Sequence, residues 1–179
     1  MVRWGLIPFF AKGEPPKLSC IHARIETVET APSYRGPWKR GQRCLQVAAG
    51  FYEWHLNGEG RKAPYLIRVA DQDVFAFSGL WDRSFKADGT AVESCVHVTR
   101  PANELMREIH NTGNNPHRMP AILRKEHWDA WLQGSMDEAK AVLQQHPAAR
   151  MSAYEVSTRV NSPKNNDGTL ILPVGPETD

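Results

Sequence analysis

The stretch Gly50-Phe51-Tyr52-Glu53-Trp54 places one carboxylate among three large aromatic side chains. The apolar run 45–49 precedes it and the polar turn 57–60 follows, a pattern typical of a strand that enters a β-hairpin. Alternation along such a strand puts Tyr52 and Trp54 on one face and Glu53 and His55 on the other. A poorly hydrated Glu53 would have a raised pKa, which suits a general acid or base. An exposed Glu53 on an edge strand fits the same pattern.

Length and composition favour one domain with a single core. The chain has 179 residues, of which 41% are hydrophobic, and its 13 Gly and 13 Pro indicate many turns rather than a helical bundle. We expect one domain over residues 1–174 and a mobile tail over 175–179. The net charge of +2 is compatible with nucleic acid, but any phosphate-binding surface must then arise from local clustering of Arg and Lys.

The cysteines and histidines do not form a recognisable metal or redox motif. Cys20, Cys44 and Cys95 are odd in number and widely spaced, which favours a reduced cytoplasmic chain. The sequence has no H-x-x-x-H, no P-loop and no G-x-S-x-G, so we expect no metal and no cofactor. It also shows no signal peptide and no apolar run long enough to span a bilayer.

Several further segments have clear periodicity. Residues 21–27 alternate strictly and predict a half-buried strand with His22, Arg24 and Glu26 on its polar face. Residues 63–70 and 74–81 predict two strands joined as a hairpin by 71–73. The remaining expected elements are strands at 92–99, 121–123 and 151–160 and helices at 102–110, 125–132 and 137–145.

A basic cluster lies between residues 34 and 43. Its cations are interleaved with aromatic residues, an arrangement that suits the phosphates and bases of a single-stranded nucleic acid. A solvated basic turn is an equally good interpretation of the segment by itself. The members of the cluster are Tyr34, Arg35, Trp38, Lys39, Arg40 and Arg43.

These stretches also carry a resemblance to a known family. The chain resembles the SRAP family (SOS response-associated peptidase), whose members cross-link to abasic sites in single-stranded DNA. The order and spacing of the matching stretches cover nearly the whole chain and make the resemblance specific. In chain order they are Trp4-Gly5-Leu6-Ile7-Pro8, Ala23-Arg24-Ile25-Glu26-Thr27, Arg43-Cys44-Leu45 through to Trp54, Phe75-Ala76-Phe77-Ser78-Gly79-Leu80-Trp81, Thr99-Arg100-Pro101-Ala102-Asn103, Ile109-His110, Arg118-Met119-Pro120-Ala121-Ile122-Leu123 and the closing 156–171.

The resemblance implies a fold and a set of roles. The implied fold is a single mixed α+β domain around a curved, barrel-like β-sheet with flanking helices and a positively charged groove. The resemblance implies that Glu53 and His110 assist the chemistry at the abasic sugar. The DNA contacts that we expect, from the resemblance and from the basic cluster, are Arg24, Trp4, Pro8, Arg118, Arg35, Trp38 and Arg40.

Two departures from the family pattern concern histidines. The family reads Asn-Ala-Arg where this chain reads His22-Ala23-Arg24, so we expect His22 in the catalytic pocket, where it can hydrogen-bond and also carry charge. The connection 111–117 is longer than in the family. Either His110 or His117 can therefore occupy the catalytic position, and the Ile109-His110 pair favours His110.

The third departure concerns the nucleophile. The family begins Met-Cys-Gly-Arg, and the Cys exposed after Met removal offers an amine and a thiol that close a thiazolidine ring with an aldehyde. This chain begins Met1-Val2-Arg3-Trp4, so we expect it either to lack the true N-terminus or to be a shortened relative. The three internal cysteines cannot substitute, because their nitrogens are in peptide bonds.

We therefore expect a monomeric cytoplasmic enzyme, associated with the nucleoid during DNA damage, that processes abasic sites in single-stranded DNA. The resemblance implies a covalent cross-link through an N-terminal Cys, with autopeptidase (hydrolase) and lyase activities, and no association with membranes. The alternative is a non-covalent single-stranded DNA-binding module that has lost the covalent chemistry. A cysteine peptidase acting on other proteins would need a Cys–His pair that the sequence does not identify.

Overall fold

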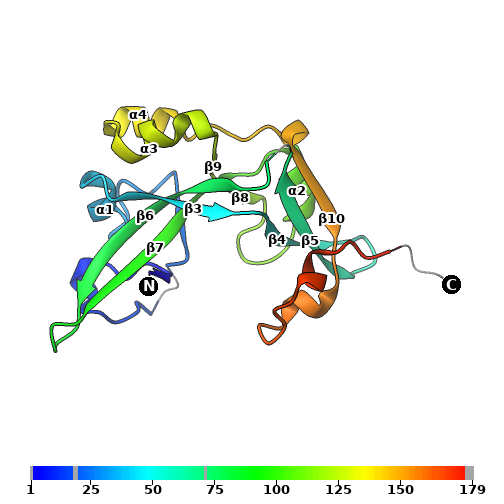
Figure 1. The fold of residues 1–179 in the computed structure, drawn as a ribbon, viewed down its shortest axis with the longest axis horizontal. Helices are drawn as coiled ribbons and strands as arrows, with labels where there is room; N and C mark the ends of the chain where they lie inside the picture. Colours follow the sequence, from blue (N-terminus) through cyan, green and yellow to red (C-terminus); the bar gives the residue numbers. More distant parts are fainter. Residues whose placement is uncertain (1, 18–19, 71, 176–179) are drawn as a thin grey trace. The chain divides into compact units, whose positions relative to one another are not determined.

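The computed structural model describes residues 2–17, 20–70 and 72–175, and the chain forms two compact units (Figure 1). The first unit comprises Met1–Val47, Phe75–Arg100 and Pro120–His146. The second comprises Ala48–Val74, Pro101–Met119 and Pro147–Asp179. Each unit is thus assembled from three separate stretches of the chain.

The first unit is built on a seven-stranded sheet whose main path has the order β1-β7-β6-β3. The long strands β6 and β7 pair antiparallel, and the short strands β1 and β2 both pair parallel with β7. Strand β9 pairs antiparallel with β6, and β8 spans the point where the chain leaves the second unit. The strands are β1 (Arg3–Trp4), β2 (His22–Arg24), β3 (Arg43–Ala48), β6 (Phe75–Phe85), β7 (Ala91–Pro101), β8 (Arg118–Pro120) and β9 (Ile122–Leu123).

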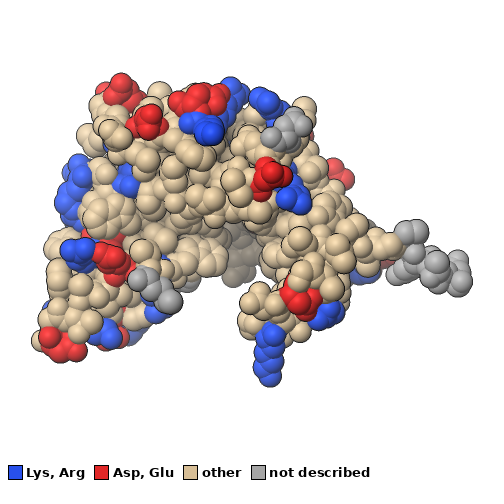
Figure 2. Space-filling view, viewed as in Figure 1, with Lys and Arg blue, Asp and Glu red and all other residues tan. Residues whose placement is uncertain are grey.

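The core of the first unit lies between this sheet and short helices. Strand residues alternate, so Ala23, Leu80 and Val96 are fully buried. They pack with Trp38 and Trp131, whose rings are 6.1 Å apart. The helices of this unit are α1 (Arg35–Lys39), α3 (Trp128–Gln133) and α4 (Met136–Ala141), with the 3₁₀ turns η1 (Phe9–Ala11) and η2 (Lys125–His127). Figure 2 shows Lys and Arg interspersed with Asp and Glu over α3 and α4.

The second unit is built on a three-stranded antiparallel sheet with the order β10-β5-β4. Strand β4 (Phe51–Leu56) is joined to β5 (Lys62–Val69) by the expected turn, with Glu53 opposite Tyr65. The third strand is β10 (Met151–Glu155), and helix α2 (Glu104–Ile109) packs beside β4. The 3₁₀ turns of this unit are η3 (Ala148–Arg150), η4 (Thr158–Asn161) and η5 (Gly168–Ile171).

The α+β class is confirmed, and two details of the prediction are wrong. Among the described residues, each sheet runs from one edge strand to another, so neither closes into a barrel. Strands β5 and β6 exist as predicted but do not form a hairpin. Strand β5 pairs with β4 and β10, whereas β6 pairs with β7, β9 and β3.

The predicted domain 1–174 stays a prediction, and residues 176–179 of the expected tail lie outside the described part of the chain. No helix in that described part is long and apolar enough to cross a membrane.

Candidate functional site

Helix α2 and the residue after it bring a histidine to the edge of the three-stranded sheet. Asn103 caps the N-terminal end of the helix with a side chain that accepts a hydrogen bond from the Met106 N–H, and His110 caps its C-terminal end. Asn111 then pairs with the free edge of β4: its Oδ1 accepts from the Leu56 N–H at 2.8 Å and its Nδ2 donates to the Leu56 carbonyl at 2.9 Å. This clamp fixes His110 next to β4.

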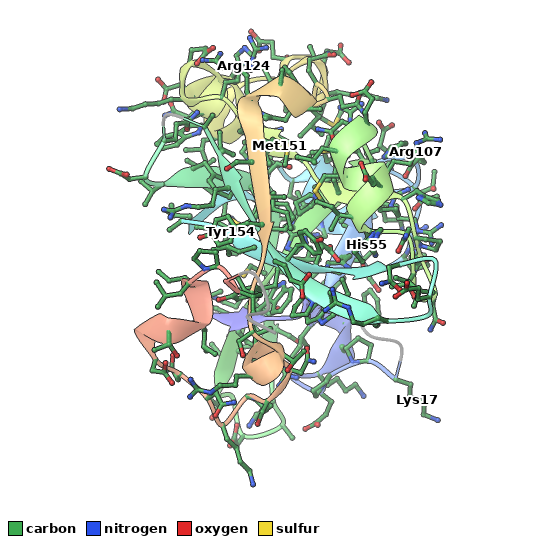
Figure 3. All side chains as sticks on the ribbon, turned by 90° about the vertical axis from the view of Figure 1, so that its right-hand side faces the viewer. Lys17, His55, Arg107, Arg124, Met151 and Tyr154 are labelled. Carbon is green, nitrogen blue, oxygen red and sulfur yellow. The ribbon has the colours of Figure 1, made fainter. Side chains whose placement is uncertain are left out.

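Glu53 and His110 face each other across this edge. The Nε2 atom of His110 lies 3.8 Å from the Oε2 atom of Glu53, and each side chain is 20% exposed. Each group therefore remains accessible to a small reactant. A neighbouring contact also joins β4 to α2: the Nδ1–H of His55, which is labelled in Figure 3, donates to the Glu108 carbonyl at 3.0 Å.

A backbone carbonyl sets the tautomer of His110. Its Nδ1 lies 2.8 Å from the carbonyl oxygen of Arg118, which can only accept, so Nδ1 carries the proton. The other ring nitrogen, Nε2, is then the one directed at Glu53 and can receive or release a proton there. The arrangement is a carboxyl group facing the unprotonated nitrogen of an imidazole.

His117, the alternative to His110, is placed differently. It adopts a left-handed conformation with a φ of 59°, and its Nδ1–H donates to the Arg107 carbonyl at 3.0 Å. Its backbone N–H donates to the His110 carbonyl at 2.7 Å. The connection 111–117 thus ends in a turn that packs on the C-terminal end of α2. His110 is the histidine that contacts Glu53.

The environment of Glu53 raises its pKa. Burial is the largest cause, and it outweighs the opposite effects of His110, of the Trp54 backbone N–H and of Lys62. A raised pKa increases the fraction of Glu53 that carries a proton near neutral pH. Of the two interpretations that the sequence left open, the poorly hydrated Glu53 is the one that this burial favours, and its role in a reaction stays a prediction.

The opposite face of the sheet is covered by C-terminal turns. The Trp54 Nε1–H donates to Asn161 Oδ1 at 2.8 Å, and the hydroxyl of Tyr154, labelled in Figure 3, donates to the Ile171 carbonyl at 2.8 Å. Trp54, Lys62 and Asn161 line a cavity of about 410 Å³ on this side. The predicted alternation is correct, because Trp54 faces these turns while Glu53 faces His110.

His22 belongs to the first unit, in a group of rings around β7. It is the register partner of His97, and the two imidazoles are 4.6 Å apart. The Trp4 indole stacks on His97 at 5.8 Å with an interplanar angle of 19°. Burial, with His22 as a lesser cause, lowers the pKa of His97 to about 3, so this ring is neutral at ordinary pH. Trp4 remains 55% exposed.

The arginines predicted to contact DNA differ in their exposure and in their partners. Arg24 and Arg35 are exposed in the first unit. Arg40 is also exposed, but it forms an ion pair with the buried Asp82 at 3.1 Å. Arg118 is half-buried in β8, and its carbonyl holds His110. These four placements do not test DNA binding, which stays a prediction.

Two predicted contacts are wrong because the side chains are buried. Trp38 is 2% exposed and packs on Trp131 in the core of the first unit, so its ring cannot stack on a base. Pro8 is also buried, and it begins the 3₁₀ turn η1. The exposed rings of this segment belong instead to Phe9 and Phe10.

Cys44 and Cys95 are poor nucleophiles. Cys44 and Cys95 line a cavity of about 360 Å³ in the first unit. Burial raises the pKa of Cys44 to about 12, with Cys95 as a lesser cause, and burial also raises the pKa of Cys95. The thiols therefore stay protonated at neutral pH. Among the described residues no group of three or more His, Cys, Asp or Glu side chains could hold a metal ion.

Sequence reasoning did not identify His97, Asn111, Phe9 or Phe10. His97 carries a usable signal, because it sits between Val96 and Val98 in an alternating strand and must face away from their core. The two phenylalanines directly follow Pro8, where a turn is expected, and large apolar residues in a turn are candidates for contacts. The contact of Asn111 with β4 has no comparable local pattern.

The fold and the site define a class of protein: an α+β protein with a Glu–His pair at the edge of a sheet. A family model described as SOS response associated peptidase (SRAP) matches residues 1–163. The chain belongs to this family. The resemblance stated from the sequence motifs is thus confirmed.

Relatives and solved structures agree with this membership. The abasic site processing protein YoqW of Bacillus subtilis is 39% identical over 173 residues, which cover 95% of this chain and 74% of YoqW. The abasic site processing protein HMCES of Gallus gallus is 30% identical, over 97% of this chain and 56% of HMCES. A crystal structure of a protein from Bacteroides thetaiotaomicron is similar with a TM-score of 0.85 and 32% identity, over 96% of this chain and 75% of that protein.

Proposed function

We propose that this protein processes abasic sites in single-stranded DNA, and that Glu53 and His110 handle the protons of the reaction. The observation that carries the proposal is the pairing of a carboxyl group of raised pKa with the Nε2 atom of His110 at 3.8 Å. The similarity to YoqW and HMCES, which are both abasic site processing proteins, supports this choice of substrate.

The chemistry needs a proton donor and a proton acceptor near the sugar. An abasic deoxyribose exists mainly as a ring, and opening it breaks the C1′–O4′ bond while the C1′ hydroxyl loses its proton to give the aldehyde. A partly protonated Glu53 suits the donation of a proton to O4′ as this bond breaks. The Nε2 atom of His110 suits the proton transfers that accompany addition of an amine to the aldehyde and loss of water.

The covalent step belongs to an N-terminal cysteine. Its amine would condense with the aldehyde to an imine and release water, and its thiol would then add to the imine carbon to close a thiazolidine. The family motif that carries this Cys, Met-Cys-Gly-Arg, does not occur in the sequence given, and the thiols of Cys44 and Cys95 are held protonated. We therefore propose that a stable cross-link to the abasic site requires the Met-Cys-Gly-Arg segment. The autopeptidase activity requires the same segment.

DNA binding is assigned to the exposed cations and rings of the first unit. Arg24 and Arg35 offer charge for phosphates, and Trp4 offers a ring face to a base. This combination favours single strands, whose bases are free to stack, and its affinity should fall with salt because phosphate contacts release counterions. Cytoplasmic location and a monomeric state belong to the same proposal.

Two measurements test the proposal. Gel shifts with matched single-stranded and double-stranded oligonucleotides, at low and high salt, should show tighter, salt-sensitive binding to the single strand. Incubation with single-stranded DNA containing one abasic site should alter the strand at that site, and the intact oligonucleotide should remain unchanged. Equal binding to both forms that is insensitive to salt would contradict the DNA assignment, and an unaltered abasic strand would contradict the chemistry.

A further inference from the structure

Asn111, the residue after His110, bonds the edge strand β4 through both ends of its side-chain amide. Its Oδ1 accepts from the Leu56 N–H at 2.8 Å, and its Nδ2 donates to the Leu56 carbonyl at 2.9 Å. The side chain thereby pairs with the main chain in the way that a neighbouring strand would. The contact requires a short side chain that offers a donor and an acceptor together, which an amide does.

The spacing of the contacts along β4 relates this clamp to the direction of the His110 ring. Glu53 and Leu56 are three residues apart on the same strand, which corresponds to about 10 Å. His110 faces Glu53 while Asn111, its neighbour in the chain, bonds Leu56. Because two consecutive residues contact one strand at two separate points, both the position and the rotation of the chain between them are fixed.

The other contacts of His110 are made with elements other than β4. Its N–H donates to the Met106 carbonyl at 2.8 Å, and its carbonyl accepts from the His117 N–H at 2.7 Å. Its Nδ1–H donates to the Arg118 carbonyl at 2.8 Å. These bonds hold His110 with respect to α2, the connection 111–117 and β8. Alignment of the ring with a carboxyl group on β4 needs a contact that reaches β4, and Asn111 supplies one.

We propose that Asn111 is a positioning residue for the Glu53–His110 pair: by bonding the main chain of Leu56, it keeps the Nε2 atom of His110 directed at the Glu53 carboxyl group. The inference rests on the proposed function, because it concerns the alignment of the same pair. Neither the motifs nor the family resemblance gives Asn111 this role. The alternative is that Asn111 only covers the edge of β4, where a strand would otherwise expose unpaired backbone groups.

The first measurement needs no DNA. The imidazole ¹⁵N resonances of His110 are compared in the parent and in Asn111→Leu, each with and without Glu53→Gln. Leu has the same branched outline as Asn but offers no hydrogen-bond donor or acceptor. In the parent, Glu53→Gln should displace the Nε2 resonance, because the carboxyl oxygen lies 3.8 Å from that atom. In Asn111→Leu this displacement should be lost, and in the control Asn114→Leu, at an exposed position of the same connection, it should be kept.

The second measurement is the single-turnover rate of adduct formation with abasic single-stranded DNA, trapped by borohydride. A misplacement of about 1 Å in a reacting group can cost about 10²-fold, so we expect Asn111→Leu to lower the rate by about 10- to 100-fold. The Kd for undamaged single strands should not change. In a His110→Asn protein the same substitution should cost less than about 2-fold, because the ring that Asn111 positions is already gone.

The possible outcomes separate the inference from the proposed function. The inference would be overturned if a folded Asn111→Leu protein kept the displacement, or if the parent showed none. Equal losses of rate with and without His110 would also overturn it and would assign Asn111 to the strand edge alone. A parent that forms no adduct with abasic DNA would contradict the proposed function, and the resonances would still decide the role of Asn111. If thermal unfolding shows that Asn111→Leu is not folded, Asn111→Ala takes its place with the same expected results.

Discussion

The Nε2 atom of His110 lies 3.8 Å from the Oε2 atom of Glu53, and the Arg118 carbonyl holds the proton of His110 on the other ring nitrogen. This relationship joins two residues that are far apart in the sequence through the clamp between Asn111 and Leu56. Both residues belong to the second unit of the fold, so the proposed proton-handling role can be tested by substitutions within that unit.

Replacement of Glu53 by Gln removes the titratable proton and keeps the shape. If Glu53 moves a proton in the reaction, processing of abasic DNA should slow by about 10²- to 10⁴-fold. Binding to undamaged single strands should stay nearly intact, because the change removes no cation. Glu59→Gln, at an exposed turn of the same unit, is the matched control. A folded Glu53→Gln protein that is as active as the parent would disprove the role.

One pair of variants can show whether His110 or His117, at the two ends of the segment 110–117, takes part in the reaction. His110→Asn removes the ring that faces Glu53, and we expect a loss of about 10²-fold or more in processing. His117→Asn should leave activity within about 3-fold, because Asn tolerates the left-handed conformation that His117 adopts. The reverse pattern in single-turnover assays of the two proteins would move the proton-handling role to His117.

Stability should depend on pH with opposite signs at Glu53 and Glu155. Burial raises the folded-state pKa of Glu53, so the folded protein holds a proton that the unfolded chain releases, and the free energy of unfolding falls as pH rises above about 4.5. Glu53→Gln should therefore unfold at a higher temperature than the parent at pH 7.5, and this advantage should vanish near pH 4.

Glu155 supplies the opposite case in the same unit. Its hydrogen bonds with Arg61, at 2.7 and 3.0 Å, are the largest cause of its lowered pKa. This stabilisation is present above the ordinary pKa and is lost as pH falls through the folded value. Glu155→Gln should then lower the unfolding temperature at pH 7.5 and change it little at low pH. If the two variants changed the unfolding temperature in the same direction at pH 7.5, one of the two assignments would be wrong.

The sequence predicted correctly those features that depend on the pattern of neighbouring residues. Alternation correctly separated Glu53 from Trp54, and the turn 57–60 correctly joined β4 to β5. The pairing of strands that are distant in the sequence could not be predicted. The short segment 71–73 indicated a hairpin between β5 and β6, yet β5 pairs with β10 from near the end of the chain. Trp38 was misplaced for the same reason, because Trp131, which covers it, comes from the distant helix α3.

The ring stack in the first unit predicts an indirect role for His97. This buried, neutral ring supports the exposed Trp4 at 5.8 Å, and Phe77 lies 5.5 Å behind it. His97→Ala should weaken binding to single-stranded DNA by about 2- to 10-fold, the equivalent of one aromatic pair. If His97 acts by positioning Trp4, the same change should have no effect in a Trp4→Ala protein, and His97→Phe should restore binding. Additive losses in this double-mutant cycle would refute positioning.

The last prediction concerns covalent chemistry at the N-terminus. A protein with the printed sequence has an α-amine on Met1, or on Val2 after Met removal, and an amine of pKa about 7.7–8 is partly neutral at pH 7. It can condense with the abasic aldehyde to a Schiff base, and the iminium acidifies the neighbouring carbon so that the 3′ phosphate leaves. We expect weak strand cleavage and an adduct that survives heat only after borohydride reduction.

Addition of a segment beginning Met-Cys-Gly-Arg should convert this transient adduct into a stable one. The thiol beside the amine can close a thiazolidine, which no longer needs reduction, and the same segment with Ala in place of Cys is the matched control. Denaturing gels with abasic single-stranded DNA, run with and without borohydride, distinguish the three proteins. A heat-stable adduct from the printed sequence without reduction would reveal another nucleophile. Because burial holds the Cys44 and Cys95 thiols protonated, that result would place the reaction centre away from those cysteines as well as from the N-terminus.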